Sequence, residues 1–257
     1  MRILVTNDDG ITAPGLKLAE EIAAEIAGPE GEVWVCAPDF ERSGASHAIT
    51  YAGALRMSQL GPRRYTVDGY PADCVLAGLR GFLRDSPPDL ILSGVNRGHN
   101  IAEDVVYSGT AGAAMEGGLN GIRSIALSQA YSAGPNRPDD MWEPAQAWGV
   151  KAVRAALKMP IDDHAFYNVN FPAVRTDLIL GMTVCDQGIR AEATFELVPY
   201  EAPNGRNFLF MRHNTANSSA PAGSDARLGL EGWVTITPLR PQLTATDLID
   251  GARAVLG

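Results

Sequence analysis

The chain has 257 residues, of which 46% are hydrophobic and 20% charged, and its formal net charge is −9. These fractions are ordinary for a folded globular protein, and no apolar run reaches the roughly 18 residues that a membrane helix needs. Acidic residues outnumber basic ones by 30 to 21, and the basic residues form no cluster. Polymeric nucleic acid and an anionic membrane are therefore poor candidates as partners, and a small anionic substrate would need a local cation or a helix N-terminus.

The three cysteines, Cys36, Cys74 and Cys185, lie far apart and form no C-x-x-C pair. Their apolar neighbours indicate buried free thiols in a reducing compartment. Strand-like sequence begins at Arg2, which leaves no room for an export signal before it. We expect a cytoplasmic protein.

Hydrophobic periodicity predicts strands that alternate with helices in the N-terminal half and somewhat beyond it. The predicted strands cover residues 1–6, 33–37, 89–93 and 124–128. The predicted helices cover residues 14–27, 72–84, 111–119 and 144–157. This alternation predicts a mostly parallel sheet covered on both faces, which is a doubly wound, Rossmann-like α/β core.

After about residue 170 the pattern becomes β-like. Residues 193–198 and 207–213 flank a turn-rich Ala-Pro-Asn-Gly and predict a long hairpin. A further strand is expected at 232–238 and a terminal helix at 246–256, with Thr244 or Thr246 as its N-cap. Residues 132–140 and 217–225 have the composition of surface loops. We expect a core over 1–184, a hairpin and loop region for oligomerisation over 185–230, and a final strand and helix over 231–257.

Polar side chains follow three of the predicted strands. Asp8 and Asp9 follow the first, Ser43 lies in the loop after the second, and Asn96 follows the strand at 89–93. Ligands of open α/β sheets bind beyond the carboxyl ends of the strands. Two adjacent carboxylates without a basic partner repel each other unless a cation neutralises them. Mg²⁺, Mn²⁺ and Ca²⁺ favour such oxygen ligands, whereas zinc favours His or Cys.

Each of these motifs also has a plain structural interpretation. Taken alone, Asp8-Asp9-Gly10 is more often a polar turn that caps the next helix than a metal site. Asn96 and Asn100 suit turns in a glycine-rich loop. The position of the aspartates at a strand end favours the metal site.

A second feature is the sequence Ser108-Gly109-Thr110, which leads into a helix of small residues. Exposed backbone N–H groups, two hydroxyls and the positive end of the helix dipole suit a phosphate group. N-capping by Ser108 or Thr110 is compatible with that role.

Other motifs do not fit known sites. The segment from Gly10 to Lys17 is similar to a P-loop, but the lysine comes one place late and Leu18 follows it. No G-x-G-x-x-G follows a strand, so nothing supports a dinucleotide cofactor. The histidines show no metal-ligand spacing and are interpreted as surface or hydrogen-bonding residues; they are His47, His99, His164 and His213.

Taken in order, the motifs closely resemble the SurE survival protein family. The likeness continues in Asn-Val-Asn-Phe-Pro at 168–172 and Ile-Thr-Pro-Leu at 236–239, and so covers nearly the whole chain. The motifs that carry it are Asn-Asp-Asp-Gly at 7–10, Ala-Pro-Asp at 37–39, Ser-Gly at 43–44, Pro-Ala-Asp-Cys-Val at 71–75, Ser-Gly-Val-Asn-Arg-Gly at 93–98 and Tyr-Ser-Gly-Thr at 107–110.

The resemblance implies a nucleotidase that acts on nucleoside 5′- and 3′-monophosphates. It also implies one divalent metal ion per subunit, Mg²⁺ or Mn²⁺, with Ca²⁺ as a substitute in a crystal, and a homodimer or homotetramer built through an exchanged C-terminal region. It places the metal on Asp8, Asp9, Ser43 and Asn96. Two departures from the family pattern are Tyr70, where threonine is usual, and Ala111, where valine is usual. Tyr70 would alter the rim of the substrate site, so the resemblance does not predict which base is preferred. Ala111 is expected to affect only packing.

The expected mechanism is attack on phosphorus by a water that the metal has made more acidic. Asp8 or Asp9 would orient or deprotonate the water, and Tyr107 or Tyr70 would stack on a base. One alternative is a covalent aspartyl-phosphate on Asp8, and another is a receiver-type phosphoacceptor without turnover. The residues expected to hold phosphate oxygens are Ser43, Gly44, Asn100, Ser108, Gly109 and Thr110.

Overall fold

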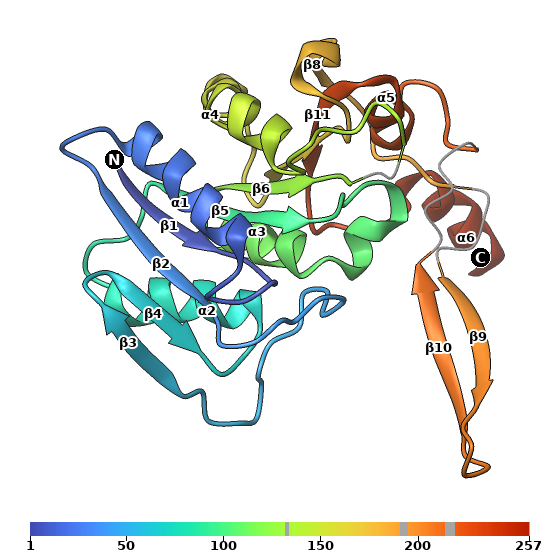
Figure 1. Cartoon of the computed structure of the whole chain (residues 1–257), viewed down its shortest axis with the longest axis horizontal. Coiled ribbons are helices and arrows are strands. Elements are labelled where there is room, and N and C mark those ends of the chain that lie inside the picture. Colours follow the sequence, from blue (N-terminus) through green and yellow to red (C-terminus); the bar gives the residue numbers. More distant parts are fainter. Residues whose placement is uncertain (132–133, 191–194, 214–218, 257) are drawn as a thin grey trace.

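The computed structural model describes residues 1–131, 134–190, 195–213 and 219–256. One nine-stranded sheet forms the centre of the molecule (Figure 1), with the strand order β3-β4-β2-β1-β5-β6-β7-β11-β8. Its strands are β1 (Arg2–Thr6), β2 (Glu32–Pro38), β3 (Met57–Gly61), β4 (Arg64–Val67), β5 (Leu90–Arg97), β6 (Arg123–Gln129), β7 (Phe166–Phe171), β8 (Gly181–Val184) and β11 (Trp233–Leu239).

The strands from β4 across to β7 are parallel. Strand β3 runs antiparallel to β4, and β11 runs antiparallel to β7. The chain passes from β1 to β2 and β4 on one side, and then places β5, β6 and β7 on the other side. The strand order therefore reverses between β1 and β5, which is where open α/β sheets bind ligands. The predicted doubly wound α/β fold is confirmed.

Helices cover both faces of this sheet (Figure 1). Helices α1 (Pro14–Ala27) and α4 (Glu143–Lys158) contact each other on one face, and α2 (Pro71–Ala77) and α3 (Gly109–Leu119) contact each other on the opposite face. The apolar stripe of α1, which includes Leu16 and Ile22, is buried against the sheet. Gly15 permits this close packing, because a Cβ atom there would lie 1.9 Å from the carbonyl oxygen of Val95.

Several elements differ from the sequence prediction. The helix expected over 72–84 breaks after α2 into a π-helical turn, Gly78–Phe82, in which Gly81 has non-helical torsion angles. Helix α5 (Asp225–Glu231) begins at the end of the segment predicted as a loop. Strands β3, β4, β7 and β8 were absent from the prediction. Residues 132, 133, 217 and 218 of the two predicted loops lie outside the described residues.

The predicted hairpin consists of β9 (Phe195–Glu201) and β10 (Asn207–His213), which pair antiparallel as a separate two-stranded sheet. It extends away from the body of the molecule (Figure 1). Residues 193 and 194, predicted as part of its first strand, lie outside the described residues.

The C-terminus forms a 3-10 turn, Thr246–Leu248, followed by helix α6 (Ile249–Leu256), no residue of which is buried. Ala245 occupies the N-cap position and makes no side-chain capping bond, so the expected cap by Thr244 or Thr246 is wrong. Strands β8 and β11 belong to the main sheet; the division of the chain at 184 and 230 stays a prediction. Among the described residues, no helix is long and apolar enough to cross a membrane.

Candidate functional site

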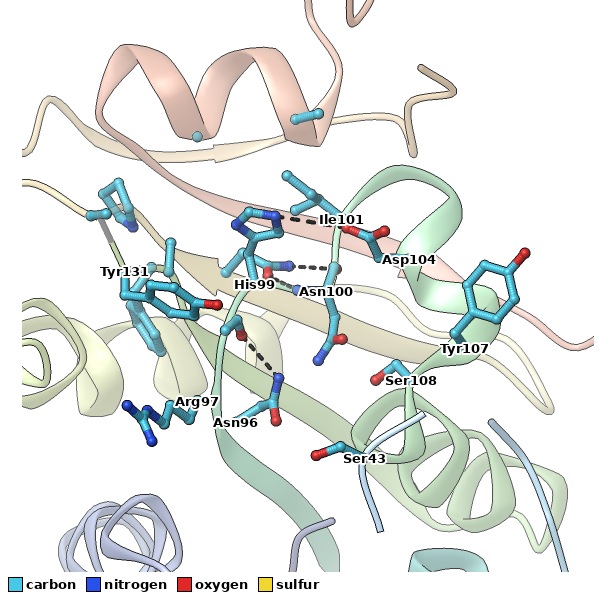
Figure 2. Close-up of a pocket in the computed structure, with 18 of the residues that line it drawn as sticks. Ser43, Asn96, Arg97, His99, Asn100, Ile101, Asp104, Tyr107, Ser108 and Tyr131 are labelled. Atoms are coloured by element: carbon cyan, nitrogen blue, oxygen red, sulfur yellow. Dashed lines mark hydrogen bonds and ion pairs between the residues drawn. The ribbon is translucent and has the colours of Figure 1, made fainter. Parts of the chain in front are cut away.

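A cavity of about 730 Å³ opens at the carboxyl ends of the central strands. It lies at the predicted place, where the strand order reverses between β1 and β5. Asp8 after β1, Asn96 at the end of β5 and Ser108 before α3 line it together with Ser43. Figure 2 shows Ser43, Asn96, Asn100 and Ser108 around one end of this cavity. Residues far apart in the sequence thus meet in one place.

Asp8 lines this end of the cavity, whereas Asp9, the next residue in the chain, does not line it. Asp8 is 3% exposed and Asp9 is half-buried. Burial raises the pKa of Asp8 to about 6, and the charge of Asp9 adds to the rise. Burial also raises the pKa of Asp9, although a hydrogen bond from the backbone N–H of Arg97 to its Oδ2, at 3.1 Å, opposes the rise. Across the described residues, neither carboxylate forms an ion pair with a lysine or arginine.

The start of α3 holds Asp8 in place. The Thr110 hydroxyl donates a hydrogen bond to Oδ1 of Asp8, and Thr110 is fully buried. Gly109 permits this approach, since a Cβ atom there would lie 2.9 Å from Cβ of Asp8. Gly109 and Thr110 do not line the cavity. The side chain of Thr110 therefore orients a carboxylate, and the phosphate contact expected of Thr110 stays a prediction.

Ser43 and Asn96 present oxygen atoms at the same end of the cavity. Ser43 and Gly44 are exposed in the loop after β2, and the Ser43 hydroxyl donates to Glu41 Oε1 at 2.9 Å. Asn96 donates through Nδ2 to the carbonyl oxygen of Gly98 at 3.0 Å. That bond fixes the orientation of the amide and distinguishes its nitrogen from the carbonyl oxygen Oδ1, which is the atom that can bind a cation.

Ser108 and Asn100 are both buried at the cavity wall. The Ser108 hydroxyl accepts a hydrogen bond from the backbone N–H of Ala111 at 3.0 Å, so Ser108 is the N-cap of α3. The amide of Asn100 donates to the Ser128 hydroxyl, and its backbone N–H donates to Oδ1 of Asn170 at 2.8 Å. These bonds make the wall rigid before any ligand binds.

The donor set fits a hard divalent cation. A buried carboxylate such as Asp8, with a second carboxylate beside it and no ion pair, is costly unless a positive charge compensates it. No three His, Cys, Asp or Glu side chains in the described part of the chain gather as a metal site. A cation here therefore depends on the hydroxyl of Ser43 and the amide oxygen of Asn96 as well as on Asp8 and Asp9. Oxygen ligands of this kind suit Mg²⁺ or Mn²⁺.

The other end of the cavity is more apolar. It is lined by Phe171 at the end of β7, by Pro172 and Val174 after that strand, and by Leu230 of α5. Tyr107 lines the cavity beside Ser108 (Figure 2) and packs edge-on against Phe195 of the hairpin, with ring centroids 5.0 Å apart.

Tyr131 and Tyr70 differ in their relation to this end. Tyr131, which sequence reasoning did not single out, lines the cavity with 62% of its surface exposed. Tyr70 does not line the cavity; its ring lies 5.7 Å from the guanidinium carbon of Arg42. Of the two tyrosines expected as base contacts, Tyr107 lines the cavity and Tyr70 does not, and the base contact itself stays a prediction.

A charged cluster adjoins the cavity. His99 and Asp104 both line it, and Nε2 of His99 lies 3.7 Å from Oδ2 of Asp104. Arg190, whose side chain is 1% exposed, donates to Glu103 Oε1 at 2.8 Å and to Oδ1 of Asp104. Sequence reasoning missed Asp104 and Arg190, because these two residues are 86 positions apart and no local pattern joins them.

Comparison with known proteins places the chain in a family. The sequence profile of the family described as survival protein SurE matches residues 3–194. A 5′-nucleotidase SurE from Cereibacter sphaeroides is 49% identical over 261 residues, covering 100% of both chains. A 5′-nucleotidase SurE from Roseobacter denitrificans is 48% identical over 253 residues, covering 97% of each. The crystal structure of the SurE protein from Aquifex aeolicus covers 100% of both chains with a TM-score of 0.83 and 36% identity. The chain therefore belongs to the SurE survival protein family.

Proposed function

We propose that the chain is a metal-dependent phosphomonoesterase that hydrolyses nucleoside 5′- and 3′-monophosphates to nucleoside and phosphate. The name 5′-nucleotidase SurE, which the relatives from Cereibacter sphaeroides and Roseobacter denitrificans carry, supports the nucleotidase activity. The observation that carries the proposal is the convergence of the buried carboxylate of Asp8 with Asn96 and Ser43 in one cavity beside the N-terminus of α3, next to the half-buried carboxylate of Asp9.

The residues divide into two roles in this proposal. Asp8, Asp9, Ser43 and Asn96 would hold one Mg²⁺ or Mn²⁺ ion, which supplies positive charge and makes water more acidic when bound. The phosphate would lie against hydroxyl and N–H donors at the start of α3 and in the loop after β2. One of the two aspartates accepts the proton of the attacking water. The residues assigned to the phosphate are Ser43, Gly44, Asn100 and Ser108, which line the cavity, and Gly109 at the start of α3, which does not line it; Thr110 orients Asp8.

The apolar end of the cavity would hold the nucleoside. Tyr107, Tyr131 and Pro172 offer flat or apolar surfaces to a base, and described residues along this wall present few base-specific donors. We expect broad tolerance of the base. The net charge of −9 disfavours binding of the flanking phosphates of a polynucleotide.

A substrate panel tests the proposal. At one saturating Mn²⁺ concentration, kcat/KM should be far higher for several nucleoside monophosphates than for bis-p-nitrophenyl phosphate, because a diester has lost an oxygen that the metal and the helix N-terminus would bind. A sugar phosphate should fall between them, since it lacks the base. A preference for the diester would overturn the proposal.

Rapid quenching separates the proposed direct attack by water from a covalent route through Asp8. We expect no acid-stable phosphoenzyme during turnover of a nucleoside monophosphate. A phosphoenzyme that forms and decays at the rate of turnover would establish the covalent route. Stoichiometric phosphorylation without turnover would instead indicate a phosphoacceptor protein.

The proposal includes assembly into a homodimer or homotetramer in the cytoplasm. The hairpin exposes Leu209 and Met211, and α6 exposes Leu256, so these elements present apolar surface that a second copy would cover. Replacing Leu209 and Met211 by serine should lower the sedimentation mass, whereas Asn204→Ser at the hairpin turn should leave it unchanged. A wild-type mass equal to one chain at micromolar concentration would contradict the assembly.

A further inference from the structure

The imidazole of His99 lines the cavity but has no part in the phosphate site described above. Its side chain is 17% exposed, and its Nε2 lies 3.7 Å from Oδ2 of Asp104. In Figure 2 the ring lies above Asn100, on the side away from Ser43 and Asn96. His99 thus lines the cavity on the side away from Ser43 and Asn96.

Hydrolysis of a phosphomonoester requires a proton donor for the oxygen that leaves. As the P–O bond to the nucleoside breaks, the electron pair stays on the nucleoside oxygen, which becomes a strongly basic alkoxide unless it receives a proton. Donors that bind the phosphate oxygens stabilise the transferred group but give no proton to the leaving oxygen. The site therefore needs an acid beside the nucleoside.

Among the cavity-lining residues, His99 is suited to this task. Tyrosine and arginine hold their protons too tightly near neutral pH, carboxylates release theirs too readily, and histidine both holds and releases one in this range. Asp8 is assigned to the metal. In the part of the chain that the structure describes, the titratable side chains that line the cavity are Asp8, Arg97, His99, Asp104, Tyr107 and Tyr131.

Charged groups surround His99 on the side of Asp104. Arg190 pairs with both Glu103 and Asp104. Asp225 adds a further carboxylate next to this cluster, fixed by the backbone N–H groups of Ala102 and Gly188. Arg97 lines the same cavity, where it is exposed and solvent screens its charge.

We propose that His99 is the general acid that protonates the leaving nucleoside oxygen, and that Asp104 is its positioning residue. This inference rests on the proposed phosphomonoesterase function. As the oxygen of water bonds to phosphorus and its proton passes to an aspartate, the bond to the nucleoside breaks. The nucleoside oxygen takes the proton of the imidazolium, and His99 is left neutral. Exchange of protons with solvent restores both groups.

The test compares two leaving groups in the full chain with Mn²⁺. p-Nitrophenolate is stable as an anion and leaves without a proton, whereas the alkoxide of AMP needs one. His99→Asn should lower kcat for AMP by about 10²–10⁴-fold, remove the alkaline limb of its pH profile, and leave kcat for p-nitrophenyl phosphate within a few-fold. The retained activity shows that the variant is folded.

His164→Asn is the matched control, because His164 is exposed and asparagine accepts its positive φ. It should change neither activity. Asp104→Asn should lower turnover of AMP selectively and by less than His99→Asn. An equal loss on both substrates, or no loss on AMP, would overturn the inference while the proposed function stands. A wild-type chain that hydrolyses neither substrate would overturn the proposed function and this inference with it.

Discussion

The side chains around the cavity at the ends of β1 and β5 are packed differently from those of the β9–β10 hairpin. Around the cavity, buried polar groups such as Asp8, Thr110 and Asn100 are fixed by hydrogen bonds to residues from other elements. On the hairpin, apolar side chains such as Leu209 and Phe210 are exposed, and the two strands pair with each other alone.

This difference separates a region whose polar groups are already ordered from a region whose apolar surface, as we propose, a second copy covers. A pre-organised polar crevice can bind a small charged ligand without rearrangement. A two-stranded hairpin with an apolar surface is at best marginally stable in water by itself. The predictions below test the first region against the second.

The largest effect is expected in the crevice. Asn96→Ala should lower kcat by about 10²–10³-fold, because it removes an oxygen ligand of the proposed metal ion, whose charge would stabilise the transition state. Asn204→Ala, at the hairpin turn, should leave kcat unchanged. The measurement is steady-state turnover of AMP together with the melting temperature, which both variants should retain. Equal activities in the two variants would remove Asn96 from the site.

A smaller effect is expected from the residue that holds Asp8. Thr110→Val keeps the shape of the side chain and removes its hydroxyl, so the affinity for Mn²⁺ should fall by about 10–100-fold. Thr12→Val is the matched control, because Thr12 is exposed in the segment between β1 and α1 that also contains Asp8. Calorimetric titration with Mn²⁺ gives both affinities. An unchanged affinity in Thr110→Val would show that this hydroxyl does not orient the ligand.

The smallest effects concern stability and compare the two regions directly. Gly15→Ala should destabilise the fold by about 1–3 kcal/mol, because its Cβ would meet the backbone of Val95. Gly251→Ala in α6 meets nothing within 4 Å and should stabilise that helix by about 0.5–1 kcal/mol. Denaturant unfolding measures both. Destabilisation by Gly251→Ala would indicate that a second copy packs closely on α6 at this residue.

The sequence predicted the N-terminal elements well because their apolar residues repeat with clear helical or strand periods. Helix α1 has the predicted bounds, Pro14–Ala27. The meeting of Asp8, Ser43 and Asn96 was also predictable, because the carboxyl ends of parallel strands share one edge of a sheet.

Other features depend on contacts that no local pattern reveals. Strand β7 was missed because Asn168 and Asn170 interrupt its apolar sequence, and both asparagines bond to the backbone of Asn100. Arg190 reaches Asp104 across 86 positions, so only the folded chain joins them. Thr110 is a typical helix N-terminal residue in sequence, and its bond to Asp8 becomes evident only when α3 is packed beside β1.

The central claim is that oxygen ligands at the ends of β1 and β5 hold one catalytic divalent ion. The most direct measurement is turnover of AMP by the full chain after exhaustive treatment with EDTA, followed by stepwise addition of Mn²⁺ with the bound metal counted at each step. We predict no turnover in the metal-free protein and full recovery when one Mn²⁺ is bound per chain. Full turnover by the metal-free protein would contradict the account.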